Sequence, residues 1–287
     1  MKENNPDSPE NLSMEGVVQD IMDTLLYQRE VFAIGVGGCG CNTVEYISDM
    51  NMENVKTIGI NTDKRVLDLN VDRQMLIGKD LTDGNGANGD PNIGKRAAEH
   101  NEEQILKTLD GADFVVLVTG MGGGTGTGAS KVIADLARRN GKLVVTFAVM
   151  PFSVEKSRYE MAQNHIEELS KLSNATTIFE NDRALELGKN KTPSEAFKVA
   201  DRMLHQLVQR LQMDYVTEFF HEVGIEDIGF LENLSVDEDE LREEPVEAEQ
   251  KVEEPPVLEA LRVVEGGQTD LEDFNQNLEP FPDNHSC

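Results

Sequence analysis

A glycine-rich stretch between a strand-like and a helix-like segment constrains this chain more than any other feature. Residues 120–129 read GMGGGTGTGA, and they join the apolar run 114–118 to the amphipathic segment 130–137. Where side chains are missing, backbone N–H groups can crowd against a bound anion, which the positive end of the following helix would face. No lysine lies in the stretch, so it differs from the usual P-loop, GxxxxGK[ST]. The sequence predicts an anion-binding loop rather than a hinge or linker, because strand and helix patterns abut it on both sides.

Short apolar runs alternate with helical patterns along much of the chain. Further strands are predicted at 31–34, 57–60, 143–149 and 176–179, and residues 75–77 form another short apolar run. Near-continuous apolar strands that are separated by helices are typical of a parallel sheet covered on both faces. We therefore expect an α/β fold with a doubly wound parallel sheet. A long helix near 194–211, with Ser194 as its N-cap, would end this domain.

Two more glycine-rich loops precede the one at 120–129. Residues 35–40, GVGGCG, fit the dinucleotide-binding pattern GxGxxG after a predicted strand, although that pattern alone is weak. Asp63, a candidate ribose-binding acid, follows the pattern later than such an acid usually does. Residues 84–94, GNGANGDPNIG, form the other loop, and a helix around 105–109 is predicted after it. The GxGxxG match keeps an NAD-dependent enzyme open as one alternative.

Length and composition bound the class of protein. The chain has 287 residues, of which 38% are hydrophobic, and a mean hydropathy of −0.42, so it can build a core while part of it stays solvated. No apolar run is long enough for a transmembrane helix, and the polar residues 1–12, expected to be disordered, do not resemble a signal peptide. We expect a cytoplasmic protein without direct membrane insertion. Its cysteines, Cys39, Cys41 and Cys287, predict neither a disulfide framework nor a metal site.

The net charge of −28 is spread unevenly, since half of it lies in residues 233–287. Low hydrophobicity and like-charge repulsion predict that this acidic tail is disordered. Leu258, Leu261 and Val264 lie among its acids, where they either form a short protein-binding motif or belong to a solubilising tail. The folded domain is expected at 13–232, beginning with an amphipathic helix. We expect no nucleic-acid partner, because the chain has no basic stripe.

Residues 122–128, GGGTGTG, resemble the signature of the tubulin/FtsZ family. The run AFKVAD at 196–201 is similar to the start of the long central helix of FtsZ, and the resemblance covers about residues 30–211 with the motifs in the same order. It implies an FtsZ-like GTP-binding domain that holds GTP or GDP together with Mg²⁺. It also implies a role in cell-division or cytoskeletal filaments, with a complete FtsZ homologue or another copy of this chain as head-to-tail partner. No residue of the chain is predicted to be catalytic, and none to bind a metal directly.

The same resemblance implies a nucleotide site built from several loops. The phosphates would lie against Gly37, Gly38, Gly123, Gly124, Thr125, Gly126 and Thr127, with Asn42 close to the base and Ala87, Asn88 and Gly89 beside the γ-phosphate. Glu155 and Arg158 would lie near the ribose, and Asn181, Phe197 and Asp201 would face the guanine. A carboxylate such as Asp201 can accept hydrogen bonds from guanine N1–H and the 2-amino group, which adenine does not present. An aromatic ring such as Phe197 offers the base a stacking surface.

The chain departs from the family pattern in three places. Residues 155–158 read EKSR where EGxxR is usual, and the second loop has Asn88 and Asp90 at positions that commonly hold glycine and asparagine. No NxDxxD motif follows the long helix, although acids occur at 214–227. In the family, the acids of that motif position the water that attacks the γ-phosphate held by a neighbouring subunit. We therefore expect weak GTP turnover by this chain alone, with an autonomous polymerising GTPase as the alternative.

Overall fold

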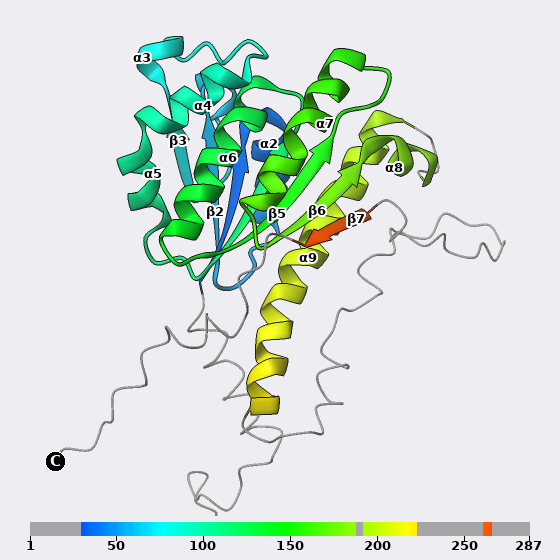
Figure 1. Ribbon diagram of the computed structural model, residues 1–287. Coiled ribbons are helices and arrows are strands. Elements are labelled where there is room, and N and C mark those ends of the chain that lie inside the picture. Colours follow the sequence, from blue (N-terminus) through cyan, green and yellow to red (C-terminus); the bar gives the residue numbers. More distant parts are fainter. Residues whose placement is uncertain (1–29, 188–191, 223–260, 266–287) are drawn as a thin grey trace, which may run out of the picture.

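The computed structural model describes residues 30–187, 192–222 and 261–265 of the chain (Figure 1). Within these residues, seven strands form one sheet in the order β3-β2-β1-β4-β5-β6-β7. The strands are β1 (Val31–Val36), β2 (Val55–Asn61), β3 (Arg73–Leu76), β4 (Phe114–Gly120), β5 (Leu143–Met150), β6 (Ala175–Glu180) and β7 (Leu261–Glu265). Strands β1 to β6 are parallel, and β7 pairs antiparallel with β6.

Helices cover both faces of this sheet (Figure 1). They are α2 (Gly37–Asp49), α3 (Lys79–Thr82), α4 (Pro91–His100), α5 (Glu102–Leu109), α6 (Gly124–Arg139), α7 (Lys156–Lys171), α8 (Asn181–Leu187) and α9 (Pro193–Glu222), with a 3-10 turn η2 at Lys64–Val66. One hydrophobic core joins α4, α5, α6 and α7 to one face, and a second joins α2, α8 and α9 to the other. The predicted doubly wound α/β fold is confirmed.

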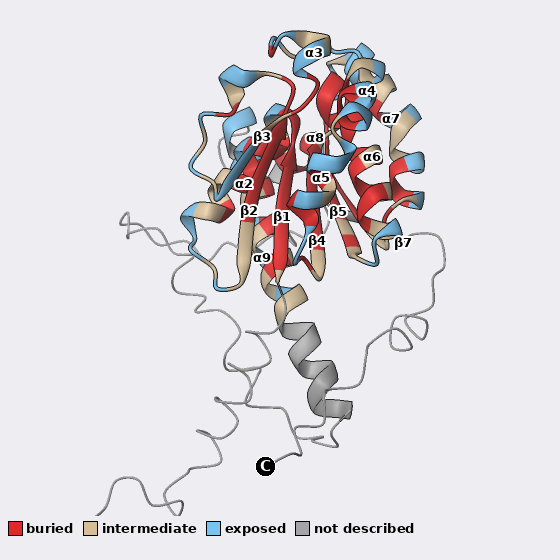
Figure 2. Cartoon of the chain, turned by 90° about the vertical axis from the view of Figure 1, so that its left-hand side faces the viewer, coloured by how far each residue is buried: buried red, intermediate tan, exposed pale blue. Residues whose placement is uncertain are grey.

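The strands alternate their side chains between these two cores. In β1, Ile34 belongs to the core under α6, and Ala33 belongs to the core under α2. All six residues of β1 are buried, and Figure 2 shows the same for the centre of the sheet, with exposed residues on the outer faces of the helices. Strands buried on both faces read as continuous apolar runs, which is why β1, β2, β4, β5 and β6 lie where the sequence predicted strands. Strand β3 was not predicted, and it begins with the exposed residues Arg73 and Gln74.

Three helices begin inside stretches that were predicted as loops, and one of them is α2, which starts at Gly37. Helix α4 starts at Pro91 and α6 starts at Gly124, so the second half of each glycine-rich stretch is helical. Proline suits the first position of a helix, and the Asp90 carboxylate caps α4 by accepting a hydrogen bond from the Asn92 N–H at 2.9 Å. The prediction that these glycines form only loop was therefore wrong.

The long helix also differs from its prediction. Helix α9 starts at Pro193 and continues to Glu222, so Ser194 lies inside its first turn and is not the N-cap. The predicted end near residue 211 was therefore too early. Helix α8, between β6 and α9, was not predicted.

Several predictions concern residues outside the described part of the chain. They are the disorder of residues 1–12, the helix expected from residue 13, and most of the acidic tail at 233–287. Within the tail, Leu261–Glu265 forms strand β7, so the prediction of disorder was wrong for this segment. The domain limits 13–232 stay a prediction.

Candidate functional site

The order of the strands puts a topological switch point at the carboxyl ends of β1 and β4, where doubly wound sheets form a ligand-binding crevice. These strands are parallel neighbours, yet α2 leaves β1 toward one face of the sheet and α6 leaves β4 toward the other. In open α/β sheets, ligands bind outside the carboxyl ends of the strands where successive connections diverge in this way. The glycine loops at 35–40 and 120–126 both lie at this point.

Both helices that start at the crevice begin without a capping side chain. Helix α2 follows Val36 and α6 follows Gly123, and neither N-terminus receives a side-chain cap hydrogen bond. The first N–H groups of a helix have no partner within the helix. Two sets of such donors, each at the positive end of a helix dipole, suit a ligand with several anionic groups.

The two helix starts lie against each other. Gly37 has a φ of +75°, and a Cβ atom there would lie 2.9 Å from the Gly126 nitrogen. A Cβ atom on Gly126 would in turn lie 2.3 Å from the Gly120 carbonyl oxygen. These contacts require glycine at both positions, and they join the first turns of α2 and α6 into one surface.

Two neighbouring glycines face open space instead. A Cβ atom on Gly123 would meet nothing within 4 Å, and one on Gly38 would meet a single side-chain atom at 4.0 Å. Gly124 packs tightly, since its Cβ would lie 2.8 Å from both the Ala87 Cβ and the Asp90 nitrogen. The free space therefore lies over Gly38 and Gly123, two of the positions predicted to contact phosphate.

The threonine hydroxyls of the loop hold the loop itself. Thr127 Oγ1 accepts a hydrogen bond from the Gly122 N–H at 2.8 Å, and Thr125 Oγ1 lies 2.7 Å from Thr62 Oγ1. All three threonines are buried. The donors left for a ligand are chiefly backbone N–H groups. Thr62 was not among the predicted residues, and the polar run 61–63 at the end of β2 was the signal that pointed to it.

The loop before α4 lies against the first turn of α6. Ala87 is buried, whereas Asn88 and Gly89 are exposed and have left-handed backbones, with φ of 48° and +78°. Asp90 does not extend freely toward the crevice, because its carboxylate caps α4. The structure thus brings Ala87 and Asp90, which flank Asn88 and Gly89, beside Gly124.

The start of α7 lies on the other side of the glycine loop. Arg158 donates a hydrogen bond to the Glu155 carboxylate at 2.5 Å, and its Nε lies 3.4 Å from the Gly122 carbonyl oxygen. A Cβ atom on Gly122 would lie 2.5 Å from the Arg158 carbonyl oxygen. The two residues predicted to lie near the ribose are therefore paired with each other at the edge of the crevice.

Helix α9 carries Asp201 to the side of α2. Burial raises the pKa of the Asp201 carboxyl to about 6, and a hydrogen bond from Thr43 opposes this rise. Burial, followed by the nearby Asp201 charge, raises the pKa of the Cys39 thiol to about 11, so this thiol stays protonated at neutral pH. Neither Thr43 nor Cys39 was predicted as a site residue. Their place after the first glycine loop was the signal available for them.

The other residues predicted for the base are differently placed. Phe197 is 45% exposed, and its ring centroid lies 6.2 Å from that of Phe152. Asn181 is only 4% exposed, and its Oδ1 has no hydrogen-bond partner. Asn42 is exposed on α2. Buried polar atoms nearly always have a partner, so the unpaired Asn181 oxygen is a feature that a bound ligand would explain.

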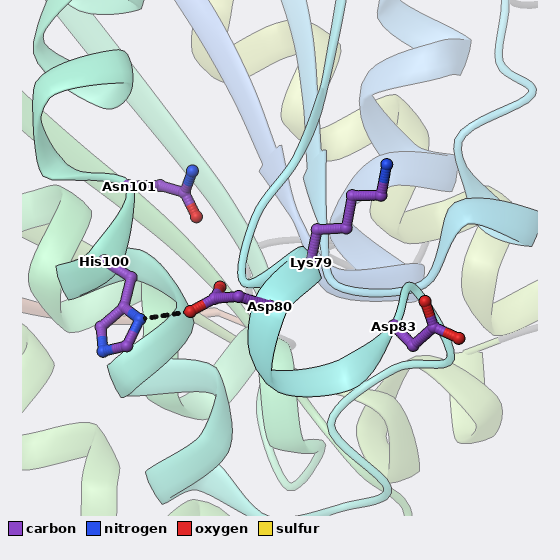
Figure 3. Close-up of a pocket in the computed structure, with 5 residues that line it drawn as sticks. All are labelled: Lys79, Asp80, Asp83, His100 and Asn101. Carbon is purple, nitrogen blue, oxygen red and sulfur yellow. Dashed lines mark hydrogen bonds and ion pairs between the residues drawn. The ribbon is translucent and has the colours of Figure 1, made fainter.

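A separate hollow of about 560 Å³ lies beside α3 and is shown in Figure 3. It is lined by Lys79, Asp80, Asp83, His100 and Asn101. His100 Nδ1 lies 2.8 Å from Asp80 Oδ2 and ties α3 to the end of α4. None of the predicted site residues lines this hollow.

Metal and membrane features can be judged only for the described residues. No group of three or more His, Cys, Asp or Glu side chains among them is arranged to hold a metal ion. No helix in the described ranges is long and apolar enough to cross a membrane.

Comparison with known proteins shows which family the chain belongs to. Residues 30–189 match the model of the GTPase domain of the Tubulin/FtsZ family. The chain belongs to the tubulin/FtsZ family. Cell division protein FtsZ 1 of Thermococcus kodakarensis is 33% identical over 273 residues, which are 88% of this chain and 72% of that protein. Cell division protein FtsZ 2 of Methanocaldococcus jannaschii is 39% identical over 194 residues, which are 65% of this chain and 51% of that protein.

Solved FtsZ structures share the fold. An empty FtsZ dimer from M. jannaschii has a TM-score of 0.63 and 35% sequence identity over 70% of this chain and 59% of that one. This chain thus spans less than two thirds of the length of that FtsZ structure. The predicted family and fold are confirmed, and the matching GTPase domain disfavours the NAD-enzyme alternative. The family match ends before Phe197 and Asp201, and the roles of individual site residues stay predictions.

Proposed function

We propose that this chain binds GTP and GDP in the crevice at the carboxyl ends of β1 and β4, and that it acts in filaments of the FtsZ class. The observation that carries the proposal is the meeting of two uncapped helix N-termini around the open space over Gly123. Membership of a GTPase-domain family supports the choice of a guanine nucleotide. Relatives named as cell division proteins support the filament role.

The backbone would hold the phosphates in this proposal. The N–H groups of Gly37 and Gly38 would donate from the start of α2, and those of residues 123–126 would donate from the start of α6, whereas the Thr127 N–H already donates to the Gly123 carbonyl oxygen. Residues 87–89 would flank the terminal phosphate, because their loop packs against Gly124. Small residues are needed wherever a phosphate would approach the backbone this closely.

Side chains would select the base. Asp201, when ionised, would accept hydrogen bonds from guanine N1–H and the 2-amino group. The unpaired Asn181 oxygen supplies a further acceptor, and the half-exposed Phe197 ring offers a stacking surface. Asn42 would lie near the base from α2, and the Glu155–Arg158 pair would contact the ribose.

Mg²⁺ would accompany the triphosphate and be held mainly by it. The described residues offer no ready-made cluster of carboxylates for the ion. Mg²⁺ commonly keeps several waters and binds through substrate phosphates.

We also propose that hydrolysis by the chain alone is weak. Phosphoryl transfer depends mainly on positioning and electrostatics, so a water that is not oriented reacts slowly. No NxDxxD motif follows α9 in this sequence. The chain would therefore offer its nucleotide face to the acid-bearing face of a complete FtsZ homologue, and the protein would act in the cytoplasm.

The test is phosphate release measured against protein concentration, with and without a complete FtsZ homologue. We expect slow release at every concentration of the chain alone, and faster release when the homologue is added. Gly123→Val is the control, because it should bind no nucleotide and so should give no extra release. Turnover that rises with the concentration of this chain alone would overturn the proposal of weak activity.

That same outcome would favour an autonomous polymerising GTPase. One observation supports this alternative: the alignment with the Thermococcus protein covers 88% of this chain, well beyond the match to the GTPase domain at 30–189. A head-to-tail polymer requires both complementary faces on each subunit. Filaments that sediment from a solution of this chain alone, with GTP, would decide for the alternative.

A further inference from the structure

The two outer strands of the parallel sheet, β3 and β6, differ in the features that protect an edge strand from pairing with another chain. At one edge, β3 is only four residues long, and both Arg73 and Gln74 are exposed. Short strands and charged residues are two ways in which natural proteins blunt an open edge. This edge therefore needs no cover.

The edge at β6 is protected neither by a short strand nor by charged residues along it. The strand reads ATTIFE over Ala175–Glu180, with no charge before its last residue, and its central four residues are buried. Threonine, isoleucine and phenylalanine all favour strands. Left open, β6 would present a row of unpaired backbone groups that a strand from another chain could bind.

Strand β7 covers this edge. Leu261 pairs with Phe179 at one end and Glu265 pairs with Ala175 at the other, in an unbroken antiparallel register. Figure 1 shows β7 running alongside β6, although residues 223–260 separate it from α9 in the sequence. The sequence also limits the strand on both sides, with two prolines at 255–256 and two glycines at 266–267.

We propose that the outer edge of β6 is a strand-docking site and that its resident occupant is β7 of the same chain. The occupant is recognised through its backbone, as in other cases where an extended segment adds a strand to a sheet. A tethered strand is present at a high effective concentration and so outcompetes the same segment from a second copy. The acids on both sides of the segment also repel a second tail. In this way β7 keeps the β6 edge from pairing with another molecule.

The experiment compares two double variants of the full chain. Val263→Pro with Val264→Pro removes two consecutive N–H donors, and neighbouring residues of a strand point their N–H groups to opposite sides, so one of them must face β6. Val263→Ala with Val264→Ala is the matched control, because it keeps both N–H groups. Hydrogen exchange of the β6 amides is measured in each, together with binding of a fluorescent peptide of residues 259–267.

We expect the β6 amides to exchange on the order of tenfold faster in the proline variant than in the alanine variant, because the edge is open. The peptide should bind the proline variant, restore the protection of those amides, and leave the alanine variant and the parent unbound. Amides of β1, in the centre of the sheet, should exchange alike in all three proteins and so report that each is folded.

Three results would overturn the proposal. Equal β6 exchange in the two variants would mean that β7 does not protect the edge. Equal peptide binding to the parent and to the proline variant would mean that β7 is not the resident occupant. The third result comes from size-exclusion chromatography. If the parent elutes as a dimer and the proline variant elutes as a monomer, β7 pairs between two copies and not within one chain. If the proline variant does not fold, peptide binding to the parent still tests the proposal. Ready binding of the peptide to the parent would overturn the proposal, and failure of the peptide to bind the parent would support it.

Discussion

Replacing Asp201 by asparagine separates what this carboxyl does for the fold from what it does for the nucleotide. Burial raises its pKa from 3.8 to about 6, so this carboxyl ionises less readily than an exposed aspartate but is still mostly ionised at neutral pH. Guanine offers two N–H donors, and the ionised carboxylate is the form that can accept both. Asparagine keeps the shape of the side chain, turns one acceptor into a donor, and removes the titration.

The effect on binding follows from this pKa. Between about pH 7.5 and about pH 5, the ionised fraction of Asp201 falls roughly tenfold, so the affinity for GTP should fall roughly tenfold, or about 1.4 kcal/mol. The γ-phosphate also titrates in this range, but it does so equally for the parent and the variant. At neutral pH, Asp201→Asn should bind GTP more weakly by about 1–3 kcal/mol, and the tenfold step should disappear from its pH profile.

The effect on stability has the opposite sign. Because the pKa of Asp201 is raised in the folded state, protonated Asp201 stabilises the fold below about pH 4, and this contribution is lost as the pH rises through about 6. The full pKa change corresponds to about 3 kcal/mol, and solvent screening of this partly exposed carboxyl reduces the expected effect to about 1 kcal/mol. The free energy of unfolding of Asp201→Asn at neutral pH should therefore exceed that of the parent by about that amount.

Calorimetric titration with GTP at both pH values, and urea unfolding at neutral pH, measure the two effects. Lys198→Gln is the matched control, since Lys198 is exposed on the same helix and lies outside the predicted site. Equal GTP affinity of Asp201→Asn and the parent at neutral pH would refute base recognition by this carboxyl. A pH profile shared by the two proteins would refute the raised pKa as the cause.

Two further predictions concern the phosphate loop and the unpaired amide. Gly123→Val should fold normally, because Gly123 has an extended backbone with φ −102° and open space around its Cβ position, yet it should lose GTP binding in the same titration. Gly124→Val should instead unfold at lower urea, because its side chain would collide with Ala87 and Asp90. Asn181→Leu should leave the free energy of unfolding within about 1 kcal/mol of the parent, since an unpaired buried oxygen is removed. It should weaken GTP binding, and unchanged affinity would exclude Asn181 from the site.

The sequence predicted the strands well and the helix starts poorly, and the glycines explain both results. A glycine run reads as a loop in a sequence, but here several glycines serve the packing of α4 on α6. A Cβ atom on Gly94 would lie 2.3 Å from the Gly124 oxygen, and one on Gly128 would lie 2.0 Å from the Pro91 oxygen. Such close approach between helices depends on residues far apart in the chain, so local patterns could not show it.

Long-range pairing limited the prediction of the site and the tail in the same way. The raised pKa of Asp201 arises where α9 packs against α2, and no local pattern reports that burial. Strand β7 is a short apolar run among acids, and only its partner β6, far away in the sequence, makes it a strand. The family resemblance was enough to predict the site residues. The contacts and burial of these residues could be described only once the fold was known.

In the proposed site, backbone N–H groups bind the phosphates and side chains select the base, and this division predicts how variants should behave. The donors around Gly123 are backbone N–H groups, which cannot distinguish one nucleoside triphosphate from another. Asp201 belongs to a different helix, and its carboxylate matches donors that only guanine carries. Gly123→Ala, a smaller change than Gly123→Val, should therefore weaken GTP and ATP by the same factor, whereas Asp201→Asn should weaken GTP and leave ATP almost unchanged. Because the two positions act on different parts of the ligand, their effects should be additive when combined. A change in the ratio of GTP to ATP affinity caused by Gly123→Ala would show that the phosphate loop and the base site are coupled, and the proposed division would be wrong.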